Sequence, residues 1–509
     1  MFKDELRDKV WNEIRQRDLR AFSKQLTPEV FAEAALRAEV TIGRSALNVV
    51  NLVWLGIAKA VQHGATFAFV LTTTLKLLED QKEFYSTSLG KQKKRAQRVR
   101  ENGKKRGGGE QSKHQPYRTD PTEVTEEAFV QARQRMPLGF WMALLAVLAE
   151  RFQEDHPKHL KFKGFRLLAM DGTTLTLPRS ARLCKHYGIP KNGQRKKAAP
   201  QARMVMLTLP GVRVPIAYEV APLSRSELEL AGQLMQHVRA NDLGLIDRGF
   251  ISYGMFWQFQ HRGAYFGTRL KKNIKYKLVK RLGPKDWLVK WTPKDSAGNW
   301  QDLPPSMELR VIHYQFPGFR ASAIITNVLD PKRLSREDWV RLAKDCDDNG
   351  KFTSGLYHRR WEIETTYFEL KVVLKTKFLR SRTPASLEYE LAGRVIYYLL
   401  LRWLIVLAAK EHGINPLRIS FTNTVRELEL MRSSLATSSA DWASRVLLPR
   451  LLLRIAAVRV PLRPGRHYPR PKDTQARDRG HGLKQLASKI SNRVNTKAQN
   501  NKQRQPCKA

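Results

Sequence analysis

Three carboxylates in this 509-residue sequence stand at positions where they could do chemistry together. Asp171 follows the apolar run 165–170, and Asp247 follows the shorter apolar run 243–246. A carboxylate at the C-terminal end of a buried strand lies where α/β folds keep their active sites. Taken singly, each has a plainer interpretation, because Asp171-Gly172 suits a hairpin turn and Asp247 suits the cap of a helix.

The third carboxylate, Glu364, lies in the segment 357–371, whose pattern predicts a helix. At about 100° per residue, four polar side chains share an arc of about 60°. They are Tyr357, Arg360, Glu364 and Lys371. This arc borders an apolar stripe, whereas a merely solvated face would lie opposite it. The stripe consists of Leu356, Ile363, Tyr367, Leu370 and Leu374. A surface ladder of helical ion pairs is the alternative, but it explains only Arg360 and Glu364.

Carboxylates that converge repel one another unless cations hold them together. Oxygen ligands of this kind suit Mg²⁺. Two such ions, about 3.5–4 Å apart, would activate an attacking oxygen and stabilise the leaving oxygen at a phosphodiester. Arginine, tyrosine and lysine side chains beside Glu364 would then hold phosphate oxygens. The residue types therefore predict metal-dependent phosphoryl transfer.

The elements that must position these residues alternate between strands and helices, which predicts an α/β fold. Residues 123–155 are expected to form two helices. Strands are expected at 165–170, 173–177, 204–209, 212–220, 243–246 and 264–270, and helices at 226–239 and 253–261. Residues 274–326 break this alternation with strand-like runs and a turn signal at 296–299, which predicts a β insertion.

Composition and pattern together divide the chain into seven segments. We predict a helical N-terminal domain at 1–85, a flexible basic linker at 86–122, the first part of the core at 123–273, the β insertion at 274–326, the second part of the core at 327–410, C-terminal helices at 411–461, and a disordered basic tail at 462–509. The linker could be a solvated spacer or could contact phosphates directly.

The charge balance calls for a polyanionic partner. Lys and Arg number 91 against 47 Asp and Glu, which gives a formal net charge of +44. This excess is too large for an ordinary metabolic enzyme, so nucleic acid is the first candidate partner and an anionic membrane surface is the weaker one. Because 42% of the residues are hydrophobic, the chain can still bury a sizeable core.

The sequence favours the cytoplasm and gives no sign of a membrane span. The most apolar stretches, 48–58 and 395–409, are shorter than the roughly 20 uncharged residues that span a bilayer, and Arg402 interrupts the second. The three cysteines are scattered and make neither a disulfide framework nor a zinc site. We therefore expect a cytoplasmic protein that acts on nucleic acid.

The spacing Tyr357-x2-Arg360-x3-Glu364-x6-Lys371 resembles the YREK signature of the DDE transposases of the insertion sequence 4 family. Segment 170–178 resembles the block that carries the first aspartate of that family, and 245–250 resembles the block that carries the second. The order of the blocks also fits, with the β insertion between the second aspartate and the glutamate. The resemblance covers roughly residues 123–410.

The resemblance implies an RNase H-like catalytic core with a β-rich insertion, flanked by helical regions. It implies an enzyme that cuts double-stranded DNA at transposon ends and joins the ends to target DNA. Asp171, Asp247 and Glu364 would be its catalytic residues and would bind two Mg²⁺ ions, with Mn²⁺ as an alternative. Tyr357, Arg360 and Lys371 would bind DNA phosphates.

The resemblance also implies a homodimer in the DNA complex, located at the nucleoid of a bacterial cytoplasm. Residues 1–85 would recognise the transposon end, an expectation that rests on position alone. In relatives that form a hairpin intermediate, the insertion holds a flipped base with the support of a tryptophan, and Ser322 stands at that place here. Trp287, Trp291 and Trp300 are candidates to replace it, although tryptophan in a β insertion more often packs.

Three other functions remain open at this point. The first is a nuclease on the same fold that cuts DNA without joining it. The second is a transposase-derived DNA-binding protein that no longer catalyses, and the presence of all three carboxylates argues against it. The third is a structural RNA-binding protein, which explains the charge but not the placement of the carboxylates.

Overall fold

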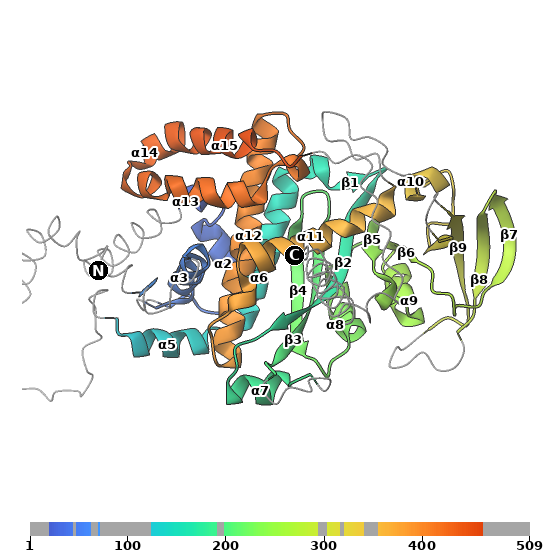
Figure 1. Ribbon diagram of the computed structural model, residues 1–509, viewed down its shortest axis with the longest axis horizontal. Helices are drawn as coiled ribbons and strands as arrows, with labels where there is room; N and C mark the ends of the chain where they lie inside the picture. Colours follow the sequence, from blue (N-terminus) through green and yellow to red (C-terminus); the bar gives the residue numbers. More distant parts are fainter. Residues whose placement is uncertain are drawn as a thin grey trace, which may run out of the picture. The chain divides into compact units, whose positions relative to one another are not determined.

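The sheet and the helices around it are seen in a computed structural model (Figure 1). The structure describes residues 20–43, 47–62, 70–71, 124–190, 198–293, 303–315, 320–340 and 355–461. The predicted linker at 86–122, the turn signal at 296–299 and the tail at 462–509 lie outside the described residues. Nearly all that is described belongs to one unit, Met1–Tyr314 with Ser322–Leu462; a second unit, 315–321 with 463–509, falls almost wholly outside.

Within the described residues, ten strands form one mixed sheet. They are β1 (Lys161–Phe162), β2 (Phe165–Thr176), β3 (Gln201–Leu209), β4 (Val214–Pro222), β5 (Asp242–Ile246), β6 (Tyr265–Arg269), β7 (Lys277–Gly283), β8 (Asp286–Trp291), β9 (Met307–Tyr314) and β10 (Ser322–Thr326). The order is β4-β3-β2-β5-β6-β10-β9-β8-β7, and β1 pairs with β2 off this path. Strand β5 is parallel to both β2 and β6, and the other pairings are antiparallel.

The strands expected at 165–170 and 173–177 form one strand, so the plainer interpretation of Asp171-Gly172 as a hairpin turn is wrong. Strand β2 runs through this point without a break, and its pairing with β3 continues there, with Asp171 opposite Met206 and Gly172 opposite Val205. An Asp-Gly pair forms a turn where no partner strand takes up its backbone groups, but β3 supplies such a partner here.

The predicted β insertion is continuous with the rest of the sheet. Strand β10 pairs on one side with β6 and on the other with β9, which leads through β8 to β7. The outermost strand, β7, is largely exposed and carries Lys277, Lys280 and Arg281. Charged side chains on an edge strand oppose the addition of strands from other molecules.

Helices pack around this sheet. They are α2 (Pro28–Arg37), α3 (Val49–Val61), α5 (Glu126–Arg135), α6 (Leu138–Asp155), α7 (Ala181–Tyr187), α8 (Glu227–Leu234), α9 (Tyr253–His261), α10 (Arg336–Val340), α11 (Trp361–Phe368), α12 (Pro384–Glu411), α13 (Phe421–Thr437), α14 (Ala440–Trp442) and α15 (Leu448–Ala457). Several begin at a polar cap whose side chain accepts a hydrogen bond from a backbone N–H: Asn48, Thr125, Ser180, Ser226, Ser252, Thr383 and Ser420. The two helices expected within 123–155 are confirmed as α5 and α6.

Helix α12 is the central helix of the core. It packs against α3, α5, α6, α13, α15 and strand β4, and Figure 1 shows it beside α6 along the sheet. By length and composition α12 could cross a membrane, although Arg402 lies within it, but 94% of its most apolar window is buried inside the fold. A core helix meets the same criteria. Contact with α3 is close, because a Cβ at Gly393 would lie 2.7 Å from the Gly56 carbonyl oxygen.

Candidate active site

Two of the predicted carboxylates lie side by side because β5 ends where its parallel pairing with β2 reaches Met170. Met170 on β2 is opposite Ile246, the last residue of β5, so the next residues, Asp171 and Asp247, are adjacent across the sheet. Asp171 Oδ1 accepts a hydrogen bond from the Gly172 backbone N–H at 2.8 Å. Parallel register therefore brings together two aspartates that are 76 positions apart in the sequence.

Asp247 also performs the capping role that is its plainer interpretation. It precedes the short 3₁₀ helix η5 (Arg248–Phe250), and its Oδ2 accepts a hydrogen bond from the Gly249 N–H at 3.0 Å. Its side chain remains 41% exposed. The cap holds the carboxylate at the strand end while leaving it accessible from solvent.

The third carboxylate meets the other two at the guanidinium of Arg360. Arg360 Nη1 lies 3.3 Å from Asp171 Oδ2 and 3.7 Å from Asp247 Oδ1, and Nη2 lies 3.0 Å from Glu364 Oε1. The arginine side chain is only 6% exposed, whereas the Glu364 side chain is 41% exposed. All three carboxylates therefore surround one buried cation, and Asp247 and Glu364 are more open to solvent than Asp171.

Burial and mutual repulsion make this group of charges unusual. Burial raises the pKa of Asp171 to about 6, the nearby charges of Asp247 and Glu364 add to the rise, and Arg360 opposes it. Around Arg360 the balance is reversed: burial acts to lower its pKa, but Tyr357 and the carboxylates together raise it. A raised carboxyl pKa beside other carboxylates is typical of a site that binds cations.

The helix expected over 357–371 is not one continuous α-helix, so that prediction is wrong in detail. Residues Leu356–Arg360 form a 3₁₀ helix (η6), α11 follows, and Glu369–Val373 form a π-helix (η7). The apolar stripe is nonetheless buried as predicted. Local departures from α geometry often mark functional positions, since they re-aim side chains that a regular helix would direct elsewhere.

These departures separate the four polar residues predicted to share one arc. Tyr357 is buried, which raises its pKa, and its hydrogen-bond partners are Thr268 and the backbone of Arg269 on β6. Lys371 donates instead to the Thr173 hydroxyl and, at 2.8 Å, to the Thr174 carbonyl oxygen on β2. Tyr357 and Lys371 thus contact two different interior strands of the sheet, and the four residues do not form a single cluster.

Known transposases are similar to this chain over much of its length. Residues 163–400 match the model of the family described as "Transposase DDE domain". The transposase InsG for insertion sequence element IS4 of Escherichia coli (strain K12) is 27% identical over 357 residues, which cover 68% of this chain and 76% of that protein. Residues 163–400 therefore resemble a transposase DDE domain, and the chain is similar to a transposase of insertion sequence element IS4. It is a DNA transposase of an insertion sequence.

Among solved structures, the chain is similar to the cryo-EM structure of a piggyBac transposase synaptic complex with hairpin DNA. The TM-score is 0.36 at 10% identity, over 90% of this chain and 88% of that chain.

DDE transposases use divalent metal ions, and the three carboxylates of this transposase fit that need by their chemistry. In the described part of the chain, no group of three His, Cys, Asp or Glu side chains is close enough to form a ready metal cage. The Arg360 guanidinium lies among the three carboxylates instead, and its Nε is buried without a hydrogen-bond partner. The positively charged side chain of Arg360 therefore occupies the place among the three carboxylates that a metal ion would take.

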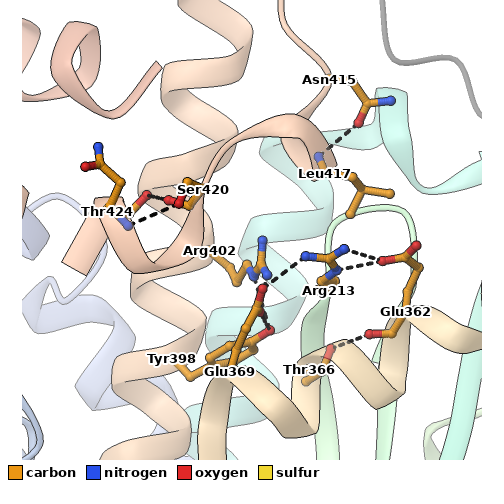
Figure 2. A network of polar contacts seen from close by, with 11 residues as sticks. Arg213, Glu362, Thr366, Glu369, Tyr398, Arg402, Asn415, Leu417, Ser420 and Thr424 are labelled. Carbon is orange, nitrogen blue, oxygen red and sulfur yellow. Dashed lines mark hydrogen bonds and ion pairs between the residues drawn. The ribbon is translucent and has the colours of Figure 1, made fainter. Parts of the chain in front are cut away.

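A buried ionic network holds the helix that carries Glu364, and only an indirect sign of this network is visible in the amino-acid sequence. Figure 2 shows Arg213, from the β3–β4 turn, between Glu362 and Glu369, at 2.6 and 3.0 Å. Glu369 also accepts hydrogen bonds from Arg402 and, at 2.7 Å, from the Tyr398 hydroxyl on α12. An arginine inside an apolar run such as 395–409 is the signal that could have predicted a buried ion pair.

The tryptophans considered as replacements for Ser322 have packing partners. Trp291 lies edge-on to Tyr253 and Phe256, with ring centroids 5.2 and 5.4 Å apart. The Trp287 ring is centred 4.3 Å from the ring of His313, and Trp300 lies outside the described residues. Ser322 itself accepts a hydrogen bond from Arg269 at 2.9 Å.

Proposed function

We propose that Asp171, Asp247 and Glu364 bind two Mg²⁺ ions, with Mn²⁺ as an alternative, in a transposase that cuts transposon ends and joins them to target DNA. The observation that carries this proposal is the contact of one guanidinium with an oxygen of each carboxylate, at 3.0–3.7 Å. Three carboxylates that can share one positive group can share a metal cation at the same place.

The remaining residues of the site would bind and orient DNA. Divalent ions held there would activate the attacking oxygen and stabilise the leaving one. Arg360 is then free to turn from the aspartates to a phosphate, whose oxygens fit the two parallel N–H bonds of a guanidinium. Tyr357 and Lys371, anchored on β6 and β2, would hold the strand on either side.

An RNase H-like core, a homodimer on DNA and a cytoplasmic, nucleoid-associated location complete the proposal. The order β4-β3-β2-β5-β6, with three antiparallel strands followed by two parallel ones, supports the RNase H-like core. A dimer follows from the need to bring two transposon ends together. Recognition of those ends by residues 1–85 and the seven predicted segments stay predictions.

The test of the proposal compares Glu364→Gln with a matched control on the same preparations. Glu364→Gln keeps size and most hydrogen bonding but removes one charge from the cation site, so cleavage of end-containing duplex DNA in Mg²⁺ should fall by orders of magnitude. Glu229→Gln removes an equal charge from an exposed pair with Arg225 and should cleave normally. Gel-shift assays should show that both variants bind DNA.

Two outcomes would contradict the proposal. Undiminished cleavage by Glu364→Gln would eliminate these three residues as the catalytic set. Intact binding without any cleavage by the unmutated protein on its own ends would favour a non-catalytic descendant of a transposase.

A further inference from the structure

A cavity of about 200 Å³ lies at the N-terminal end of the helical run that carries Glu364. Its walls come from four segments that are distant in the sequence: 158–162, 210–211, 358–362 and 415–417. One contact between the walls requires glycine, because a Cβ at Gly211 would lie 2.1 Å from the His159 carbonyl oxygen. The cavity is therefore built into the fold, and Asp171, Asp247 and Glu364 do not line it.

Positive charge dominates the lining. Lys158, Lys161 and Arg359 carry fixed positive charges, and His159 and His358 add two imidazoles. Among the residues that the structure describes, no carboxylate lies within 4.0 Å of the three fixed cations. These charges are therefore available to an anionic ligand.

The one carboxylate in the lining does not offset this charge. Glu362 pairs with Arg213 at 2.6 Å, and both side chains are mostly buried. Figure 2 shows the pair beside Asn415 and Leu417, which also line the cavity. Because Arg213 already neutralises Glu362, the lysines opposite keep their attraction for an anion.

Arg359 is positioned by an aromatic ring in the cavity wall, in a way that suits phosphate binding. Its guanidinium carbon lies 5.2 Å from the centroid of the Phe162 ring. Burial lowers the pKa of Arg359, with the charge of Glu362 acting in the opposite direction. A guanidinium over an aromatic face keeps its N–H groups at its edge, where phosphate oxygens can accept them.

The cavity and the carboxylates are linked through two consecutive residues. In the 3₁₀ helix η6, Arg360 reaches the carboxylates and Arg359 lines the cavity. Lys371 lies at the opposite end of the same helical run. A DNA strand with its cleaved bond at the carboxylates would therefore meet positive charge on both sides.

We propose that this cavity is a phosphodiester site that binds a backbone phosphate of the DNA strand a few nucleotides from the cleaved bond. The proposal rests on the proposed function, because it takes DNA at the carboxylates as its starting point. A free nucleotide shares the same phosphate chemistry, so the experiment must separate the two sources.

The first arm measures the salt dependence of duplex binding by the full chain. Lys158→Gln/Lys161→Gln should lower the steepness of log K against log salt by about 0.9, since the cavity is proposed to bind one phosphate and each lost phosphate contact lowers it by about 0.9. Lys24→Gln/Lys410→Gln, which removes the same charge from two exposed positions outside the cavity, should leave the slope nearly unchanged. Equal slopes for both double variants would overturn the proposal.

The second arm replaces DNA phosphates one at a time with neutral methylphosphonates. At one or two positions of the DNA, the methylphosphonate should weaken binding by the unmutated protein. At the same positions it should not weaken binding by Lys158→Gln/Lys161→Gln (the cavity variant) any further, because that variant has already lost the contact. Additive losses at every position would overturn the proposal. Binding of AMP or inorganic phosphate that depends on Lys158 and Lys161, with no DNA phosphate whose replacement has a smaller effect in the cavity variant, would also overturn the proposal in favour of a free nucleotide.

The outcome can be told apart from a failure of the catalytic proposal. Glu364→Gln should lose cleavage while keeping the full salt slope and the coupling to the DNA phosphate. The cavity variant should need more DNA for half-maximal cleavage but should reach the unmutated rate at saturation. If the unmutated chain binds DNA but does not cleave it, both binding arms still report on the cavity.

Discussion

Removing the carboxylate of Glu369 should destabilise this transposase far more than breaking an exposed ion pair. In the structure, Glu369 is the acceptor for Arg213, Arg402 and Tyr398, and the Arg402 side chain is completely buried. Glu369→Ala would leave the charge of Arg402 without a carboxylate, because the other group that Arg402 donates to is the neutral hydroxyl of Tyr398. An uncompensated buried charge costs about 3–5 kcal/mol.

The loss in free energy of unfolding for Glu369→Ala should stay within about 3–5 kcal/mol and should not reach twice that value. Arg213 keeps its second partner, Glu362, at 2.6 Å, so only one of the two arginines loses its counter-charge. Glu369→Met/Arg402→Met removes both charges and should recover most of the stability, because apolar residues can replace a buried pair. Asp441→Ala, which breaks the exposed pair with Arg445, should cost less than about 1 kcal/mol.

Urea unfolding followed by tryptophan fluorescence measures these differences as shifts of the transition midpoint. Glu369→Ala should also lower the rate of DNA cleavage more than DNA affinity, because Glu369 continues the helical run that carries Glu364. A loss no larger than that of Asp441→Ala would refute the idea that this network fixes the helix. If Glu369→Met/Arg402→Met were as unstable as Glu369→Ala, the loss of packing around Glu369, and not the unpaired charge of Arg402, would explain the instability.

Three further predictions concern other parts of the molecule. Burial lowers the pKa of Lys59 from 10.5 to about 8, so between these two pH values Lys59 carries a proton in the unfolded chain but not in the folded one. The free energy of unfolding, measured in urea and compared with that of Lys59→Met, should therefore rise from about pH 8 to about pH 10.5. Gly267→Ala would place a Cβ 2.2 Å from the buried Trp339 ring and should cost about 1–3 kcal/mol in thermal unfolding, whereas Gly283→Ala, with no atom within 4 Å, should cost little. Lys371→Met should weaken end binding and slow cleavage together, as measured by gel shift and strand cleavage.

Much of the candidate site follows from short-range patterns. Asp247 directly follows an apolar run, and a short apolar run bounded by polar residues predicts a buried strand. Arg360 and Glu364 are four residues apart, so a helix of any regular kind brings them near each other. The apolar stripe beside them requires the helix to lie on the core, and it does.

Other features depend on partners that are distant along the chain. Whether Asp171 lies in a turn or within a strand depends on β3, whose Met206 pairs with it. Arg213 reaches Glu362 and Glu369 from 149 and 156 positions away, and no periodic pattern encodes a contact of that separation. The same holds for the cavity that four separate segments enclose.

The sequence by itself determined which residues could bind metal and DNA, because carboxylates, arginines and their local spacing are chemical facts of the chain. Only the tertiary structure decided which of them meet. Strand register sets Asp171 beside Asp247, and the irregular helix over 356–373 directs Arg360 to the carboxylates and Lys371 to β2. Such choices depend on packing energies summed over many long-range contacts, which outweigh the local preference of any one segment.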